Sequence, residues 1–145
     1  MIRPYIIEDK EALLSILRCN IPLYFDESEE VDFIEYLDKQ AENYFIIEQG
    51  TKLIGGGGIN YFPETMLARI SWDIIHPDFQ GKGMGKKLTL FRINQIKENP
   101  TIRLIKVRTS QLAYKFYVKL GFELERIEKD FWAKGFDLYQ MKIEL

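Results

Sequence analysis

The segment whose spacing points most directly to chemistry is QGKGMG, at positions 80–85. Its three glycines, Gly81, Gly83 and Gly85, alternate with other residues and lie between an expected strand and an expected helix. Glycine lets the backbone approach a ligand closely, and the free N–H groups in the first turn of a helix bind anions. The segment therefore predicts a site for a phosphate group, most naturally a pyrophosphate.

Spacing excludes two common kinds of phosphate loop. The dinucleotide fingerprint needs a glycine three residues after its second glycine, where this sequence has Lys86 or Leu88. The nucleoside-triphosphate loop needs Ser or Thr after Gly-Lys, but Lys87 follows Gly85 and Lys86. On the glycines alone, a flexible strand-to-helix connection without a ligand remains the alternative.

Two segments together resemble the GNAT superfamily of N-acetyltransferases. QGKGMG at 80–85 is similar to the family signature Gln/Arg-x-x-Gly-x-Gly/Ala, with Ile75, His76 and Pro77 as its usual lead-in. SQLAYKFYVKLGF at 110–122 is similar to the family segment Asn-x-x-Ala-x-x-x-Tyr-x-x-x-Gly-Phe. Two motifs at this separation are more specific than either alone, and the element order is similar over essentially the whole chain.

The resemblance implies a cosubstrate, acetyl-CoA, and the residues that hold it. Acetyl-CoA would enter a splayed sheet where two parallel strands part. Backbone groups at Asp73, Ile74 and Ile75 would contact its pantetheine arm, and one N–H there would bind the thioester carbonyl. Ser110 stands where the family has asparagine. The pyrophosphate would be held by Gln80, Gly81, Lys82, Gly83, Met84 and Gly85.

The resemblance also implies catalytic residues. Tyr117 matches the tyrosine that commonly protonates the departing thiolate, although an apolar stripe on its helix would otherwise make it a core aromatic. Arg69 falls near the place of the family's usual glutamate base, so Asp73 is the nearest candidate carboxylate. Glu64 and His76 are weaker candidates, and His76 fits equally well as a cap of its turn.

The predicted function is transfer of the acetyl group of acetyl-CoA to a primary amine by direct attack. The acceptor would be a small molecule or a peptide. By the same resemblance the last hairpin helps to shape the acceptor pocket. A cationic amine could be received there by Asp130, Phe131, Trp132 and Asp137 together with Tyr24 and the acidic run 26–30, although such a run is more often only a solvated face. The alternatives are a non-catalytic acyl-CoA-binding sensor or regulatory module, and an interaction domain with a vestigial loop.

Composition sets further bounds. At 145 residues, 46% of them hydrophobic, the chain fits a single acyltransferase domain over 1–145. The chain has 20 basic and 22 acidic residues, so it has no excess of positive charge and we expect no nucleic-acid partner. No apolar run indicates a signal peptide or membrane span, so we expect a cytoplasmic protein. Cys19 is the one cysteine of the chain and His76 is its one histidine, so we expect no internal disulfide and no structural metal. We expect Cys19 to be a buried helix residue. The sequence leaves open whether the protein forms a homodimer.

Glycine and proline punctuation divides the chain into short elements. The predicted order is strand, two helices, three strands, helix, strand, helix and two strands. This order favours an α/β (α+β) fold with a mixed, largely antiparallel sheet. With the resemblance, it becomes a splayed central sheet of about seven strands flanked by about four helices. The expected strands are 2–7, 44–48, 52–61, 66–75, 102–107, 122–131 and 136–145, and the expected helices are 8–19, one after 26–30, 86–97 and 111–120.

Two local patterns carry further expectations. In the second helix, Val31, Phe33, Ile34 and Leu37 fall close to helical spacing and should form one buried stripe. Four glycines at 55–58 interrupt a strand pattern, which weakens a strand unless something approaches it closely. A bulge beside the acceptor site would explain them, and local twist without a function is the alternative.

Overall fold

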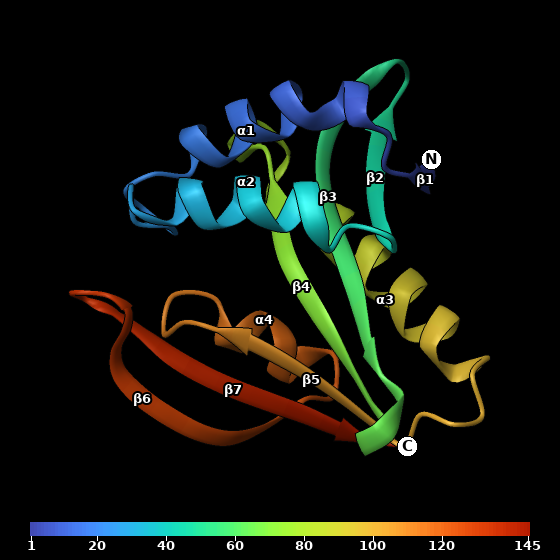
Figure 1. Cartoon of the computed structure of the whole chain (residues 1–145). Helices are drawn as coiled ribbons and strands as arrows, with labels where there is room; N and C mark the ends of the chain where they lie inside the picture. The colour runs from blue at the N-terminus through green and yellow to red at the C-terminus, as the bar shows by residue number, and fades with distance from the viewer.

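Seven strands form one mixed sheet, and four helices pack against it (Figure 1). The structure is a computed structural model that describes residues 1–145. The strand order in the sheet is β1-β2-β3-β4-β5-β7-β6. The strands are β1 (Ile2–Pro4), β2 (Tyr44–Gln49), β3 (Lys52–Phe62), β4 (Leu67–Ile75), β5 (Leu104–Thr109), β6 (Glu123–Ala133) and β7 (Phe136–Glu144). The helices are α1 (Lys10–Cys19), α2 (Glu29–Lys39), α3 (Met84–Lys97) and α4 (Tyr114–Lys119). The predicted fold class and element order are confirmed.

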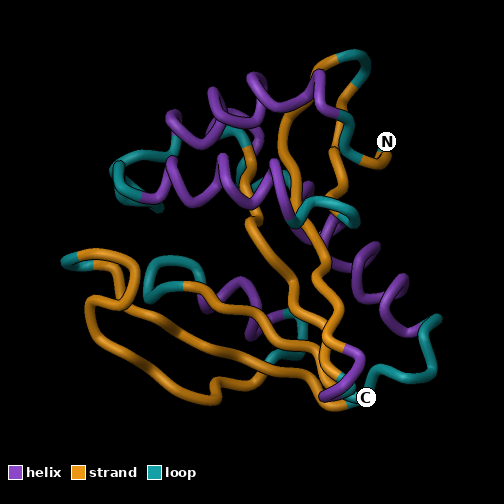
Figure 2. The backbone as a smooth tube through the Cα atoms, viewed as in Figure 1, coloured by secondary structure: helices purple, strands orange, loops and turns teal.

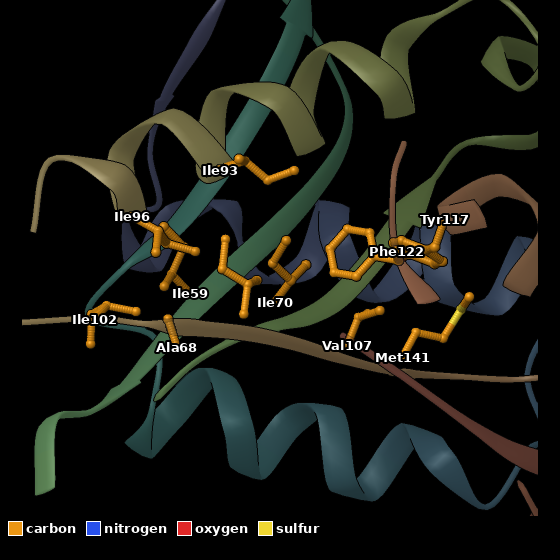
Figure 3. Packing of buried hydrophobic residues seen from close by; sticks show 11 residues of the cluster. Ile59, Ala68, Ile70, Ile93, Ile96, Ile102, Val107, Tyr117, Phe122 and Met141 are labelled. Atoms are coloured by element: carbon orange, nitrogen blue, oxygen red, sulfur yellow. The ribbon is translucent and has the colours of Figure 1, made fainter. Parts of the chain in front are cut away.

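The two main hydrophobic clusters form between the sheet and different helices. One joins α1 and α2 to β2 and β4, through residues such as Leu17, Phe33 and Ile46. The other joins α3 and α4 to the middle of the sheet, and Figure 3 shows Tyr117 beside Phe122 within it. Each fully buried aliphatic side chain contributes about 1.5–3 kcal/mol relative to an exposed one. No helix of the fold has the length and apolar character needed to cross a membrane.

The central strands β4 and β5 run parallel and then separate. Their pairing extends from Leu67 opposite Leu104 to Ile70 opposite Val107. Beyond that point β4 continues to Ile75 without a partner on β5, whereas β3 stays paired to β4 as far as Ile75. Figures 1 and 2 show the two strands starting side by side near the C-terminus and diverging. The splayed sheet that was predicted is therefore present.

A bulge in β4 sets the direction of the residues at this opening. Gly58 pairs with Ser71 and Gly56 with Ile74, so Gly57 alone lies opposite the two residues between them. Trp72, the first of these two, has a φ of 51°, in the left-handed region. Because side chains alternate along a strand, one extra residue reverses which face the following side chains occupy. Asp73 consequently points to the α3 and α4 face rather than to the face of Ser71.

Four sequence expectations need correction. Val31 is 69% exposed, so it does not belong to the buried stripe of α2, whereas Phe33 and Leu37 are buried as predicted and Tyr36 is buried with them. Cys19 is exposed at the end of α1 rather than buried. The first strand ends at Pro4, where a 3-10 turn follows. Helix α4 is shorter than 111–120 because the chain turns first, with the Leu112 N–H donating to the Ser110 hydroxyl oxygen.

Candidate active site

A cavity of about 790 Å³ opens where β4 and β5 part. It is bounded by α2, the loop before α3, the helix α4 and the β6–β7 hairpin. Of the predicted catalytic and cofactor-binding residues, the cavity lining includes Asp73, Ile74, Ile75, Gln80, Gly81, Gly83, Gly85, Ser110 and Tyr117. One site therefore brings together the two sequence motifs and the end of β4.

The glycine loop leads directly into α3 and has room around it. Gly81 and Gly83 have φ values of 73° and 82°, which disfavour residues with a Cβ atom. A Cβ atom at either position would meet no atom within 4 Å. Gly83 is the N-cap of α3, so the free N–H groups and the positive end of the helix dipole are at the cavity. This arrangement fits an anionic phosphate group.

Polar side chains fix the loop to the end of β4. The Gln80 amide donates to the Asn20 side-chain oxygen at 2.8 Å and to the Ile75 carbonyl at 3.0 Å. Asn20 donates to the same carbonyl at 3.1 Å. The His76 ring nitrogen accepts from the Asp78 N–H at 3.1 Å, so this histidine caps its turn. Gln80 and Asn20 thus hold the loop in place through their side chains.

Asp73 joins two buried side chains. Its Oδ2 accepts a hydrogen bond of 2.5 Å from the Tyr117 hydroxyl, and its Oδ1 contacts Nη1 of Arg92 at 2.5 Å. Arg92 is 0% exposed and Tyr117 is 5% exposed. Arg92 also donates to the carbonyl of Gly58 and to that of Leu88 in its own helix. The carboxylate and the guanidinium neutralise each other, which makes their burial tolerable.

The tyrosine is held in its neutral form. Burial and the neighbouring Asp73 charge and hydrogen bond raise the pKa of Tyr117 well above its ordinary value, and Arg92 acts in the opposite direction. A phenol with a raised pKa retains its proton at neutral pH. The hydroxyl therefore carries a proton, which it donates to Asp73 in this structure, and it belongs to a helix that lines the cavity.

The four glycines of β3 make room for side chains that cross the strand. A Cβ atom on Gly57 would lie 2.6 Å from Arg92 Nη1 and 2.9 Å from Asp73 Oδ1. A Cβ atom on Gly56 or Gly58 would collide with Tyr44, which packs from the other side. The bulge predicted at these glycines is present, with its extra residue on β4. Gly57 therefore allows close packing around the Asp73 carboxylate, and Gly56 and Gly58 allow close packing of Tyr44.

Arg92 was missed from the sequence, although a signal was present. It is four residues after Leu88 and four before Ile96, and all three are buried on one side of α3. An arginine within such an apolar stripe needs a buried anionic partner. The partner was not predictable, because the bulge at Trp72 decides which face Asp73 occupies.

The remaining candidates lie in different places. Ser110 is buried, and its hydroxyl accepts from the Leu112 N–H at the turn into α4. Lys82 and Met84 are not in the cavity lining: Lys82 lies over the Phe79 ring, and Met84 packs against a small cluster that includes Leu88. Glu64 is exposed in the turn between β3 and β4, also outside the lining.

The hairpin and α2 form the walls away from the glycine loop. Trp132 lines the cavity, and its indole N–H donates to the Thr109 carbonyl. Asp130 accepts from the Gly135 N–H, and Asp137 accepts from the Asp130 N–H, so these carboxylates shape the hairpin turn. Tyr24 and Glu29 line the opposite wall. Of the predicted acceptor residues, the structure thus brings Trp132, Tyr24 and Glu29 to the cavity, whereas Asp130, Phe131, Asp137 and the rest of the run 26–30 lie outside its lining.

Comparison with known proteins agrees with this geometry. Residues 25–145 match the family described as acetyltransferase (GNAT) domain. The protein YqkA of Bacillus subtilis, described as a UPF0157 protein, is 26% identical over 128 residues, which cover 81% of this chain and 37% of YqkA. The chain thus spans little more than a third of that relative.

Two solved structures show the same fold. The ribosomal-protein-S18-alanine N-acetyltransferase of Escherichia coli superposes with a TM-score of 0.80 at 18% identity, over 99% of this chain and 92% of that one. YncA of Salmonella typhimurium, solved with its cofactor acetyl-CoA, superposes with a TM-score of 0.74 at 18% identity, over 100% of this chain and 93% of that one.

Proposed function

Because the chain belongs to the GNAT family of acetyltransferases, we propose that it transfers the acetyl group of acetyl-CoA to a primary amine. Residues 1–145 would act as one acyltransferase domain, in the cytoplasm. The acceptor would be a small molecule or a peptide. The E. coli relative in the comparison is named for acetylating an alanine of a ribosomal protein, which supports an amine acceptor.

One observation carries the proposal: the glycine loop, the parted strands and Tyr117 face a single cavity. The loop supplies helix N–H groups for a pyrophosphate, and the opening between β4 and β5 leaves backbone groups after Ile70 without a partner on β5. A cofactor with a phosphate at one end and a reactive group on a long thin arm fits such a path. Coenzyme A has this form.

Acetyl-CoA supplies an activated acetyl thioester when it is bound. Gly81, Gly83 and Gly85 would hold the pyrophosphate through backbone N–H groups. The backbone at Asp73, Ile74 and Ile75 would orient the thioester and donate one hydrogen bond to its carbonyl oxygen, stabilising the negative charge that develops there. Since the Ile75 carbonyl already accepts from Gln80 and Asn20, its role is to anchor the loop.

The proton balance assigns a role to Tyr117. The neutral amine forms a C–N bond to the acetyl carbon while the C–S bond breaks, so the amine loses one proton and the thiolate gains one. The Tyr117 hydroxyl, which donates to Asp73 in the structure, would turn toward the thiolate, donate its proton there and recover a proton from solvent. The positive charge of Arg92 would stabilise the transient tyrosinate, and Asp73 would fix the position of the phenol oxygen. The amine proton would leave to Asp73 or to ordered water.

The rival from another class is a non-catalytic acyl-CoA-binding module. Both proposals expect CoA to bind, so binding alone does not separate them. Thiol release from acetyl-CoA in the presence of a panel of primary amines does, provided that acetylated amine appears in equal amount by mass spectrometry. Tight CoA binding with no thiol release from any amine would favour the sensor. Absence of CoA binding would contradict both.

A further inference from the structure

Two arginines without a carboxylate partner lie on the strand wall of the cavity. Arg69 is on β4 and Arg108 is on β5, and both line the cavity. Arg69 pairs with Lys106 in the sheet, and Arg108 follows Lys106 by two residues, so all three side chains are on one face. Resting on the proposed acetyl transfer, we propose that Arg69 and Arg108 bind an anionic group, a carboxylate or a phosphate, that the acceptor carries together with its amine.

The first argument is the lack of partners. The Nε atom of Arg69 is buried and has no hydrogen-bond partner. A buried donor left without a partner is costly, so natural proteins rarely keep one without a reason. Burial and repulsion from Arg108 lower the pKa of Arg69, whereas Arg108 itself is exposed and lines the cavity. An anion between the two guanidinium groups would give the buried Arg69 Nε a partner and offset the repulsion of Arg69 by Arg108.

The carboxylates nearby are already engaged. Glu125 on β6 pairs with Lys106 at 3.1 Å and also accepts from Gln140. Glu128 pairs with Arg126 at 3.1 Å. The strand wall around Arg69 and Arg108 therefore keeps a net positive charge.

The opposite wall of the cavity is acidic through Asp32, which has no ion-pair partner, and through Glu29 once the pH exceeds its raised pKa of about 7. Glu29, Asp32 and Glu35 of α2 line it. Glu29 accepts from the Asp26 N–H, and Glu35 pairs with Lys39 within α2. Because no ion pair joins this wall to the arginines, an acceptor with both an anion and a cationic amine would meet complementary charge on the two walls.

Aromatic rings hold the two guanidinium groups in position. Arg69 lies 5.0 Å from the centre of the Phe62 ring, and Arg108 lies 5.8 Å from that of Trp132. Such stacking leaves the edges of a guanidinium free, and those edges bind carboxylate or phosphate oxygens in pairs. The arginines are thus oriented without their donors being used.

The position of the pair sets the size of the acceptor. Arg69 precedes Asp73 by four residues on the same strand, a distance of at most about 13 Å at the rise of a strand. Arg108 is the first residue of β5 beyond its last pair with β4. The anionic group and the reacting amine would therefore be separated by no more than the length of about four extended amino-acid residues.

The test uses acceptors matched except for charge. The carboxylate pair is the dipeptide Gly-Leu and Gly-Leu-amide, and the phosphate pair is O-phosphoethanolamine and ethanolamine. Binding is measured by calorimetry with CoA at saturation, which fills the cofactor site, and kcat/KM is measured by thiol release. We expect at least one anionic probe to have an affinity and a kcat/KM about tenfold higher than those of its neutral control. The pair that shows the difference identifies carboxylate or phosphate.

Variants assign the difference to the two arginines. Arg69→Gln and Arg108→Gln should each reduce the anionic preference to near unity, whereas Arg103→Gln, at an exposed position outside the cavity, should preserve it. Equal binding of the charged and neutral probes, or a preference that survives Arg69→Gln, would overturn the subsite. Arginine-dependent binding without turnover of any amine would support the subsite and contradict the proposed acetyl transfer.

Discussion

Asp73 accepts a hydrogen bond of 2.5 Å from the hydroxyl of Tyr117, and these residues are 44 positions apart in the sequence. The contact exists because the bulge at Trp72 turns Asp73 toward α4 while Arg92 of α3 holds its other oxygen. The phenol oxygen therefore has a fixed position, in a buried environment with no net charge from the Asp73 and Arg92 pair. Such an arrangement suits a residue that must deliver a proton at one point.

The buried ion pair makes a prediction about stability. Asp73→Asn preserves the shape of the side chain but leaves the Arg92 charge buried without a partner. We expect the free energy of unfolding in urea to fall by about 3 kcal/mol. Adding Arg92→Gln should recover part of this loss, because the double variant has no uncompensated charge. A single variant as stable as the parent would mean that solvent reaches Arg92.

The packing at the β3 glycines predicts a second stability difference. Gly57→Ala would place a Cβ atom 2.6 Å from Arg92 and should cost about 2–3 kcal/mol through overpacking. Gly50→Ala is the matched control, because a Cβ atom at Gly50 would meet no atom within 4 Å and only the positive φ of 62° disfavours alanine there. We expect it to cost about 1 kcal/mol. Equal melting temperatures for the two variants would contradict the role given to Gly57.

The glycine loop predicts an effect on cofactor affinity. Gly83→Ala adds a methyl group that meets no protein atom, at a φ of 82°. The methyl group should obstruct approach of the pyrophosphate and weaken CoA binding by about tenfold or more in calorimetry. Gly50→Ala, with a comparable φ far from the loop, should bind CoA as the parent does. Unchanged CoA affinity in a folded Gly83→Ala variant would contradict the assignment of the glycine loop as the pyrophosphate site.

Glu29 predicts a dependence of stability on pH. Burial raises the pKa of Glu29 to about 7 from 4.5, although it accepts a hydrogen bond from the Asp26 N–H. A carboxyl with a raised folded pKa contributes its stability fully below pH 4.5 and loses it as the pH rises through 7. Glu29→Gln should therefore match the parent at pH 4 and exceed its free energy of unfolding by about 1–2 kcal/mol near pH 8.5, after solvent screening. A difference independent of pH would show that Glu29 ionises normally.

The sequence was sufficient for the order of the elements, because glycine and proline mark their ends and the apolar spacing marks their faces. It also located the glycine loop, since its three glycines, Gly81, Gly83 and Gly85, lie between a strand and a helix. Helix α4 was overestimated because the Ser110 hydroxyl supports a turn where the pattern favoured a helix. A local side-chain hydrogen bond of this kind competes with helix formation and is hard to detect from spacing.

The arrangement around Asp73 was not predictable. Strict alternation from Arg69 and Ser71 would place Asp73 on the same face as these residues, away from Tyr117. The reversal needs the left-handed φ of Trp72, a non-glycine residue with no sequence signal for that conformation. The glycines opposite indicated close packing but not which strand would carry the extra residue.

The steady-state turnover of Tyr117→Phe, with an amine that wild type acetylates, tests the proposed proton transfer from Tyr117 most directly. The phenylalanine ring fills the same space beside Phe122, so CoA affinity should match wild type, while loss of the hydrogen bond to Asp73 should lower stability by about 1–3 kcal/mol. If Tyr117 protonates the thiolate, kcat should fall by about 10². Wild-type turnover in a folded, CoA-binding Tyr117→Phe variant would contradict the account and leave Tyr117 as a buried aromatic that anchors Asp73.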